Sequence, residues 1–230
     1  MKPQPRHALL ASAALVLTAC GSAGLPTAPD NQPPATTIRG TVGTWSGPGT
    51  VTLPGPSGAP LARADVAAGG TFTLTLPDAS ALGGLTRSVP AAISEVGCTG
   101  TVTSGDPSAR GYAFGTLTAQ DTAGTRQVLA ADLSVGYVPP KATLLARAWL
   151  YADRATRLSG TLDCGSLIGA ASAPVTVDIP ARAGWNVVGI VVDASYGLGG
   201  VSASGRMALT TDAETTWLSS DELVAKLPGR

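Results

Sequence analysis

Histidine is almost absent from this chain: its 230 residues include one, His7, close to the start. The residues around His7 are typical of a secretory signal, so we expect the mature chain to contain no histidine. Without an imidazole, neither a Ser-His-Asp or Cys-His nucleophile nor a histidine-ligated zinc site can form. The sequence motifs of serine hydrolases, P-loop nucleotide-binding proteins and EF-hands are also missing. The sequence therefore excludes the commonest hydrolytic and metal-dependent chemistries.

A long hydrophobic run is missing as well. The apolar stretch from Ala8 to Ala19 is shorter than the ~20 residues needed to cross the hydrocarbon core of a bilayer. Together with Lys2 and Arg6 before it, this stretch is typical of a cleaved signal peptide. We predict a signal peptide over residues 1–19 and an exported mature chain.

The stretch Leu17-Thr18-Ala19-Cys20 resembles the lipobox of bacterial lipoproteins. The resemblance implies that Cys20 becomes the first mature residue and carries a diacylglyceryl group and a further acyl chain, which together anchor a protein stably. Gly21 in the next position implies sorting to the outer membrane. The expected location is the bacterial cell envelope, lipid-anchored and facing the periplasm or the surface. The other interpretation is an ordinary signal peptide followed by a chance cysteine.

Residues 20–35 follow the predicted cleavage site and are rich in proline and small polar residues. Such a composition favours an extended linker over a packed core. We therefore predict a lipidated cysteine followed by a tether that holds a folded domain away from the membrane.

Charged side chains are scarce, at 13% of the residues against a usual ~25%. Removal of Lys2 and Arg6 with the signal peptide leaves 13 basic and 15 acidic residues, because the whole chain has 15 of each. This slight excess of acidic residues gives no indication of a basic patch that could bind nucleic acid. We expect no nucleic-acid partner and no cofactor.

Cysteine is rare, with three residues in all. If Cys20 is lipidated, Cys98 and Cys164 remain, and an even pair in an exported protein predicts a disulfide. Closing a loop of this length stabilises a fold by about 4 kcal/mol in the chain-entropy model. The alternative is two buried free thiols.

Alternation of apolar and polar residues is the main pattern of the chain. In Thr71–Pro77, Phe72, Leu74 and Leu76 share one face, as in a half-buried antiparallel strand. Similar strands are predicted at 38–42, 50–54, 111–119, 126–135, 142–151, 156–163, 175–179, 186–193 and 205–211. We predict an all-β fold of antiparallel sandwiches, Ig-like or transthyretin-like, with a small β unit at 36–90 and a larger β-sandwich domain at 91–218.

One helix is expected, at the C-terminal end, over residues 219–230. Ser219 and Glu222 have the spacing of a capping box, which satisfies two backbone N–H groups of the first turn. A helix this short is unstable alone in water. Its apolar stripe is therefore expected to pack on the β-domain, and it consists of Leu223, Val224 and Leu227.

The small β unit resembles the carboxypeptidase regulatory-like (transthyretin-like) modules of bacterial surface proteins. The residues that carry this likeness are Ile38-Arg39-Gly40-Thr41-Val42 and Gly70-Thr71-Phe72-Thr73-Leu74-Thr75-Leu76. In the larger domain, segments 149–161 and 181–190 resemble parts of uncharacterised bacterial lipoproteins. Neither resemblance implies a catalytic activity.

The aromatic residues allow two interpretations. Trp45 adjoins a Gly/Pro turn, and Trp149 and Tyr151 share a strand face, so the three are candidates for ligand-facing rings, as in carbohydrate-binding modules. The alternative is that tryptophan and tyrosine fill a core that has two phenylalanines.

These features lead us to expect a non-enzymatic structural or protein-interaction module of the envelope, with another envelope protein as partner. The alternative is a surface glycan-binding module. The least favoured reading is a carboxylate-dependent hydrolase, with no metal site expected, and its candidate carboxylates are Asp153, Asp163, Asp178 and Asp193.

Overall fold

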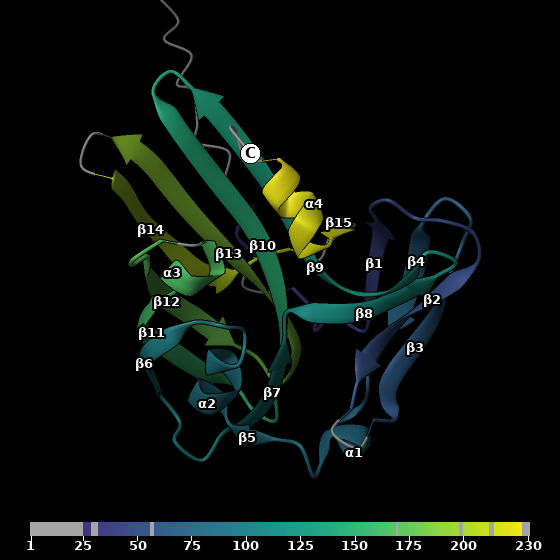
Figure 1. Cartoon of the computed structure of the whole chain (residues 1–230). Coiled ribbons are helices and arrows are strands. Elements are labelled where there is room, and N and C mark those ends of the chain that lie inside the picture. Colours follow the sequence, from purple (N-terminus) through teal and green to yellow (C-terminus); the bar gives the residue numbers. More distant parts are fainter. Residues whose placement is uncertain are drawn as a thin grey trace, which may run out of the picture.

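The described part of the chain folds mainly into β-strands (Figure 1). The computed structural model describes residues 25–28, 32–55, 58–168, 170–197, 200–211 and 214–226. The strands of these residues are β1 (Thr37–Val42), β2 (Gly49–Pro54), β3 (Pro60–Val66), β4 (Thr71–Thr75), β5 (Arg87–Ser88), β6 (Thr99–Ser104), β7 (Arg110–Phe114), β8 (Thr116–Asp121), β9 (Gly124–Tyr137), β10 (Pro140–Ala152), β11 (Thr156–Asp163), β12 (Pro174–Ala181), β13 (Gly184–Gly197), β14 (Gly200–Leu209) and β15 (Thr215–Leu218). The helices are α1 (Ala79–Leu82), α2 (Val89–Ser94), α3 (Gly165–Ile168) and α4 (Ser220–Ala225). The all-β prediction is confirmed, although α1, α2 and α3 precede the C-terminal helix that the sequence predicts.

Seven strands form a closed barrel in the order β15-β1-β4-β3-β2-β8-β9, and β9 pairs back to β15. The closure depends on β15, which runs parallel to β1 and places Thr215 opposite Gly40. Alternation along β4 turns Phe72 and Leu74 inward and leaves its threonines exposed. This part of the chain is therefore a barrel and not the sandwich expected from the sequence, because two distant segments supply the closing strands.

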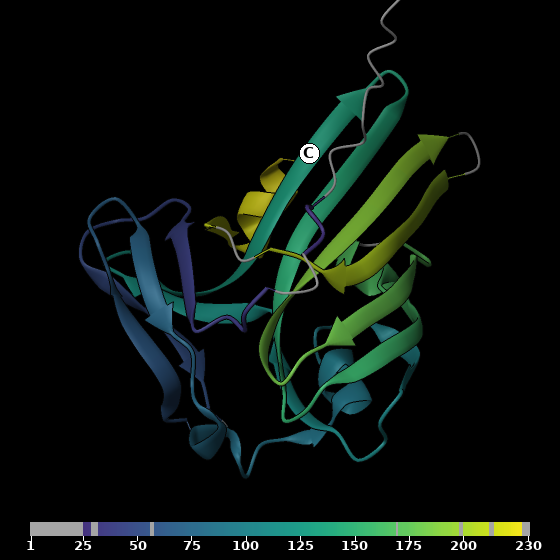
Figure 2. The ribbon, with the colours of Figure 1, turned by 180° about the vertical axis from the view of Figure 1, so that it is seen from behind.

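The remaining strands form a curved sheet that continues from the barrel, in the order β9-β10-β13-β14-β12-β11-β6 (Figures 1 and 2). β7 pairs with β10 beyond the end of β9, and β5 pairs with β7. The helix α2 covers one face of this sheet, with Val89, Ala92 and Ile93 buried. The strand β10 has a core on each side: Ala148 and Leu150 lie in the sheet's core, and Trp149 lies in the barrel's core.

The predicted boundary at residue 90 does not coincide with the edge of the barrel. β1 to β4 come from the small β unit, but β8, β9 and β15 come from the larger domain. The long strand β9 belongs to both sheets: Thr125 to Leu129 pair with β8, and Ala131 to Tyr137 pair with β10. The two units are joined by strand pairing, β2 with β8 and β1 with β15, in addition to the chain that connects them.

The disulfide between Cys98 and Cys164 is confirmed, with a Cα–Cα distance of 4.5 Å. It ties the residue before β6 to the residue after β11, at the end of a pair in which Thr99 lies opposite Asp163. Both cysteines are buried in the core of the curved sheet. The bridge therefore ties the edge strand β6 to β11 at one end of the pair.

The capping box of the C-terminal helix α4 is also confirmed. The Ser219 hydroxyl accepts the Glu222 N–H at 3.3 Å, and the Glu222 carboxylate accepts the Ser219 N–H at 2.7 Å. Leu223 is half-buried against the core of the curved sheet, whereas Val224 is 39% exposed. Leu227 lies outside the described residues. Within the ranges that the structure describes, no helix has the length and apolar character needed to cross a bilayer.

Part of the predicted tether packs on the protein. The Ala35 N–H donates to the Trp185 carbonyl at 2.9 Å, and the Ala28 N–H donates to the Leu209 carbonyl at 3.3 Å. The Thr210 hydroxyl donates to the Pro26 carbonyl at 2.6 Å. Residues 25–28 and 32–35 therefore lie along β13 and β14. This leaves less of the predicted tether, residues 20–35, to act as a linker. Cys20 and the predicted signal peptide lie outside the described residues.

Candidate functional site

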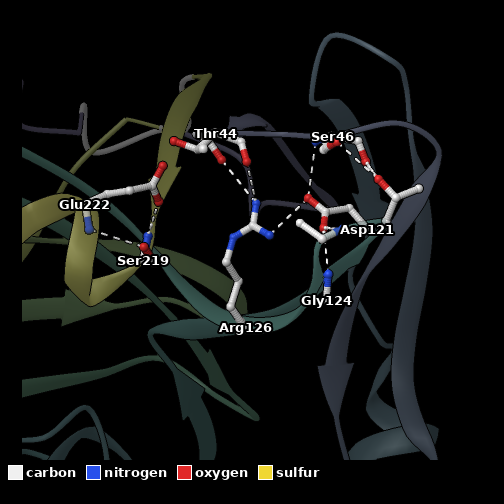
Figure 3. Close-up of polar contacts among 10 residues, drawn as sticks. Thr44, Ser46, Asp121, Gly124, Arg126, Ser219 and Glu222 are labelled. Carbon is white, nitrogen blue, oxygen red and sulfur yellow. Dashed lines mark hydrogen bonds and ion pairs between the residues drawn. The ribbon is translucent and has the colours of Figure 1, made fainter.

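A cluster of polar side chains at one end of the barrel is the first candidate site (Figure 3). Arg126 on β9 occupies its centre and forms an ion pair with Asp121, with the guanidinium 3.0 Å from the carboxylate. The same guanidinium donates to the carbonyls of Thr44 and Gly43, at 2.9 and 3.3 Å. The loop between β1 and β2 is therefore held to β9 by one side chain.

Asp121 ends β8 and has none of its side-chain surface exposed. It accepts backbone N–H groups from Ala123 at 2.8 Å, and from Ser46 and Gly124 at 3.2 Å. Burial favours a higher pKa for Asp121, but the hydrogen bonds from Arg126, Ala123 and Ser46 outweigh it, so its pKa is lowered. The carboxylate therefore stays ionised and is fully engaged, which is a structural role.

Glu222 brings α4 to the same loop. Its carboxylate accepts hydrogen bonds from the Thr44 side chain and from Ser219, and these outweigh burial and lower its pKa. Gly43 leaves space for this contact, since a Cβ there would lie 2.6 Å from a carboxylate oxygen of Glu222. Thr44 has a positive φ of 42°, which is uncommon for a residue other than glycine. The loop conformation is thus maintained by β9 on one side and α4 on the other.

Trp45, a predicted ligand-facing ring, lies in this cluster and is partly buried. The Arg126 guanidinium carbon is 5.7 Å from its ring centroid, in a cation–π arrangement. Gly49 gives the ring room, since a Cβ there would lie 2.6 Å from Trp45 Cζ2. With Arg126 over the ring, Trp45 has the surroundings of a packed loop residue.

The prediction of a ligand-facing Trp149 is wrong. Trp149 is 1% exposed and lies in a buried column, stacked between Trp217 and Phe114 at centroid distances of 5.2 and 5.7 Å. Tyr151 does share its face, as expected, but that face is the barrel's core. Tyr151 is partly buried and contacts Trp185 edge-on at 5.6 Å. The interpretation that aromatic rings fill a phenylalanine-poor core describes these residues correctly.

The four candidate carboxylates are each engaged separately. Asp153 accepts from the Arg110 N–H, Asp163 from Ser172, Asp178 from Arg157 and Asp193 from Thr143. These contacts are an ion pair, turn caps and, for Asp193, a cross-strand hydrogen bond, and none joins two of the four carboxylates. In the described part of the chain, no group of histidine, cysteine, aspartate or glutamate residues is arranged to hold a metal ion.

The sequence did not point to the exposed residues at the strand ends. Among the described residues, the large hydrophobic side chains that are exposed are Tyr137, Val138, Tyr196, Val201 and Val224. The first four lie at the free ends of the β9–β10 and β13–β14 hairpins. The strands β9 and β13 each have 14 residues, longer than the strands predicted at 126–135 and 186–193, so the sequence analysis did not reach these hairpin ends.

Comparisons with known proteins give no family for the chain. No protein-family model matches it, and no curated protein and no solved structure is significantly similar to it.

Proposed function

We propose that this chain is a lipid-anchored protein of the bacterial cell envelope that acts as a structural or protein-interaction module and not as an enzyme. The lipobox-like stretch that ends at Cys20 supports the anchor. The open edge of the curved sheet at β6 carries the proposal of a docking role. The proposed partner is another envelope protein.

The strand β6 pairs with β11 and with no other strand of the described residues. Its sequence, TGTVTS, has neither charge nor proline, although soluble proteins commonly protect edge strands with lysine or proline. Thr99, Gly100 and Thr101 are exposed. An unprotected edge of this kind suits the addition of a strand from a partner.

We also propose that the first four strands derive from a carboxypeptidase regulatory-like module, in which β1 and β4 correspond to the two matched motifs. The motifs pair with each other, with Ile38 opposite Leu74 and Gly40 opposite Phe72. In this view β1 to β4 are the transthyretin-like part, and β8, β9 and β15 are additional strands that close it into a barrel.

A glycan-binding role is the second candidate, and Trp45 is the observation that favours it. Its partly exposed ring lies beside Arg126 and the exposed Ser46. Affinity electrophoresis in gels that contain envelope polysaccharide would test it. Equal retardation of the wild type and a Trp45→Ala variant would leave this candidate without support.

The lipid anchor is tested by metabolic labelling with palmitate. The wild type should incorporate the label, whereas the Cys20→Ala variant should incorporate none and remain as an unprocessed precursor. A wild-type chain that incorporates no label would refute the proposed location.

The docking edge is tested with a photo-cross-linking amino acid at Thr101. Thr176 on β12 is the matched control, because Thr161 pairs with both residues and places all three on one face. The strand β12 has neighbours on both sides. We expect a discrete cross-linked product in cells from position 101 and none from position 176. Identical patterns from both positions would contradict docking at β6.

A further inference from the structure

Four exposed hydrophobic side chains gather at the free ends of two neighbouring hairpins. Tyr137 and Val138, at the end of β9–β10, are 69% and 96% exposed. Tyr196 and Val201, at the end of β13–β14, are 40% and 46% exposed. Figures 1 and 2 both show these hairpins projecting in the same direction, away from α2. We call these four residues the hairpin tips.

The register places three of the tip residues in one row. Tyr137 lies opposite Pro140, Lys141 lies opposite Ser195, and Tyr196 lies opposite Val201. Residues that lie opposite each other share a face of the sheet. Continuing the register by one residue brings Pro140 beside Tyr196, so the row crosses all four strands.

The row continues the apolar face of the curved sheet. One step inward, Ala142, Ala194 and Ala203 are 5%, 9% and 8% exposed, and further inward Ile190 and Met207 belong to the core. The apolar face therefore extends beyond the part of the sheet that the rest of the protein covers. Exposed apolar clusters of this kind mark contact with a partner or a membrane.

The charge of the tips favours a lipid surface. Lys141 is the one charged residue in the sequence between Leu133 and Thr143, and the sequence from Ala194 to Gly205 has none. Lys141 is exposed, and its stem lies against Gly136, where a Cβ would be 3.1 Å from Lys141 Cε. Tyrosine is enriched at membrane interfaces, and lysine can bury its stem while its ammonium group remains at the phosphates.

The path of the chain before β1 leads towards the tips. Ala35 pairs with Trp185, near the start of β13. Further back in the sequence, the Pro26 carbonyl accepts a hydrogen bond from Thr210, whose N–H donates to the Val187 carbonyl. Still further back, Leu25 lies against Gly189. Residues closer to the N-terminus thus lie further along β13 in the direction of Tyr196.

The remaining distance matches the length of chain that leads to Cys20. From Gly189 to Tyr196, the strand rises by about 24 Å. The five residues from Leu25 back to Cys20 span at most about 18 Å. The difference, about 6 Å, is comparable with the depth of one headgroup layer. Cys20 can therefore lie at the outer side of the headgroup layer into which the tips extend, with its acyl chains reaching into the bilayer.

We propose that the tips of the β9–β10 and β13–β14 hairpins insert into the interfacial layer of the bilayer that holds the lipid anchor. Tyr137 and Tyr196 lie among the headgroups, Val138 is the deepest residue, and Lys141 binds lipid phosphates. The proposal rests on the proposed lipid anchor. It implies that the protein stands on the membrane in one orientation and does not move freely on a tether.

The test uses the full lipidated chain in vesicles of phosphatidylethanolamine and phosphatidylglycerol. Single cysteines introduced as Val138→Cys and Val201→Cys carry an environment-sensitive fluorophore, and Val224→Cys on α4 is the matched control, since it replaces an exposed valine away from the tips. We expect blue-shifted emission, and quenching by headgroup-region nitroxide lipids, at 138 and 201 and not at 224. Tip labels that behave like the label at 224 in vesicle-bound protein would overturn the proposal.

Failure of the anchor is distinguishable from failure of the tips. A chain that neither incorporates palmitate nor floats with vesicles refutes the proposed lipid anchor. A chain that floats, but whose tip labels remain in water, refutes the tip contact alone. A blue shift that requires an added envelope protein extract, and not lipid, assigns the tips to a protein partner and also overturns the proposal.

A second measurement uses the rate at which the lipidated chain transfers between vesicles. Val138→Asp should accelerate transfer on the order of tenfold, because a charge replaces an inserted valine. Val224→Asp should leave the rate unchanged. Both variants should keep the wild-type melting temperature, because both side chains are exposed, and equal transfer rates would contradict the insertion.

Discussion

Trp149 and Trp217 stack inside the barrel with their ring centroids 5.2 Å apart and their planes 17° from parallel. Trp149 lies on β10 of the curved sheet, and Trp217 lies on β15, the strand that closes the barrel. Trp217 also contacts Phe72 on β4 edge-on, at 5.9 Å. The pair therefore connects the barrel's closing strand to the curved sheet.

The first prediction concerns Trp217, which is 0% exposed. Trp217→Ala should lower the free energy of unfolding by about 3–5 kcal/mol, because it leaves a large cavity next to Trp149 and Phe72. Urea unfolding followed by far-UV circular dichroism measures the change. Trp45→Ala is the control, and its loss should be smaller because Trp45 is partly exposed. Equal losses would show that the column does not hold the barrel together.

The second prediction concerns Gly40 on β1, which faces the Trp217 indole. A Cβ at this position would lie 2.6 Å from the Trp217 ring and from the Thr215 carbonyl oxygen. Gly40→Ala should therefore force β15 away from β1 and destabilise the fold by about 1–3 kcal/mol. Gly84→Ala is the matched control, because a Cβ there meets nothing within 4 Å. A melting temperature equally unaffected by both substitutions would contradict the close packing of β1 on β15.

The sequence predicted features that depend on neighbouring residues. The alternation in Thr71–Pro77, the capping box of Ser219 and Glu222, and the Cys98–Cys164 bridge are present in the structure as expected. The alternation and the capping box are set by residues close together in the sequence. The bridge could be predicted because two cysteines remain when Cys20 is set aside.

The barrel and the position of Trp149 could not be predicted in the same way. Gly40 and Thr215, which pair at the barrel's closure, are far apart in the sequence, and no local pattern specifies that contact. The predicted strand 111–119 is divided at Gly115, because β7 pairs with β10 and β8 pairs with β2 and β9. Alternation showed that Trp149 and Tyr151 share a face, but not that β15 would cover it.

The third prediction concerns Asp121 and pH. The pKa of this carboxyl is lowered in the folded state, so its contribution to stability is complete above the unfolded pKa, about 3.9. The contribution is lost as pH falls from that value through the folded pKa. As the pH falls below about 4, the wild type should lose stability more steeply than the Asp121→Asn variant. Parallel pH profiles of the melting temperature would contradict a lowered pKa of Asp121 in the folded state.

The last prediction concerns α4, which joins three parts of the fold. Leu223 packs on the core of the curved sheet, Glu222 binds Thr44 in the β1–β2 loop, and Lys226 pairs with Asp132 on β9 at 3.2 Å. The exposed ion pair contributes little, so Leu223 and the cap provide most of the stabilisation, about 2 kcal/mol together.

Deletion of residues 219–230 should therefore lower the melting temperature by roughly 4–8 °C. Leu223→Ala should account for part of that loss, and Val224→Ala, at a more exposed position of the same helix, should change it little. A deletion that leaves stability intact but abolishes association with a cross-linked partner would make α4 an intermolecular contact. A deletion that changes neither would contradict packing of the helix as a stabilising element, because a helix of six residues is not stable alone and must gain its free energy from the surface it covers.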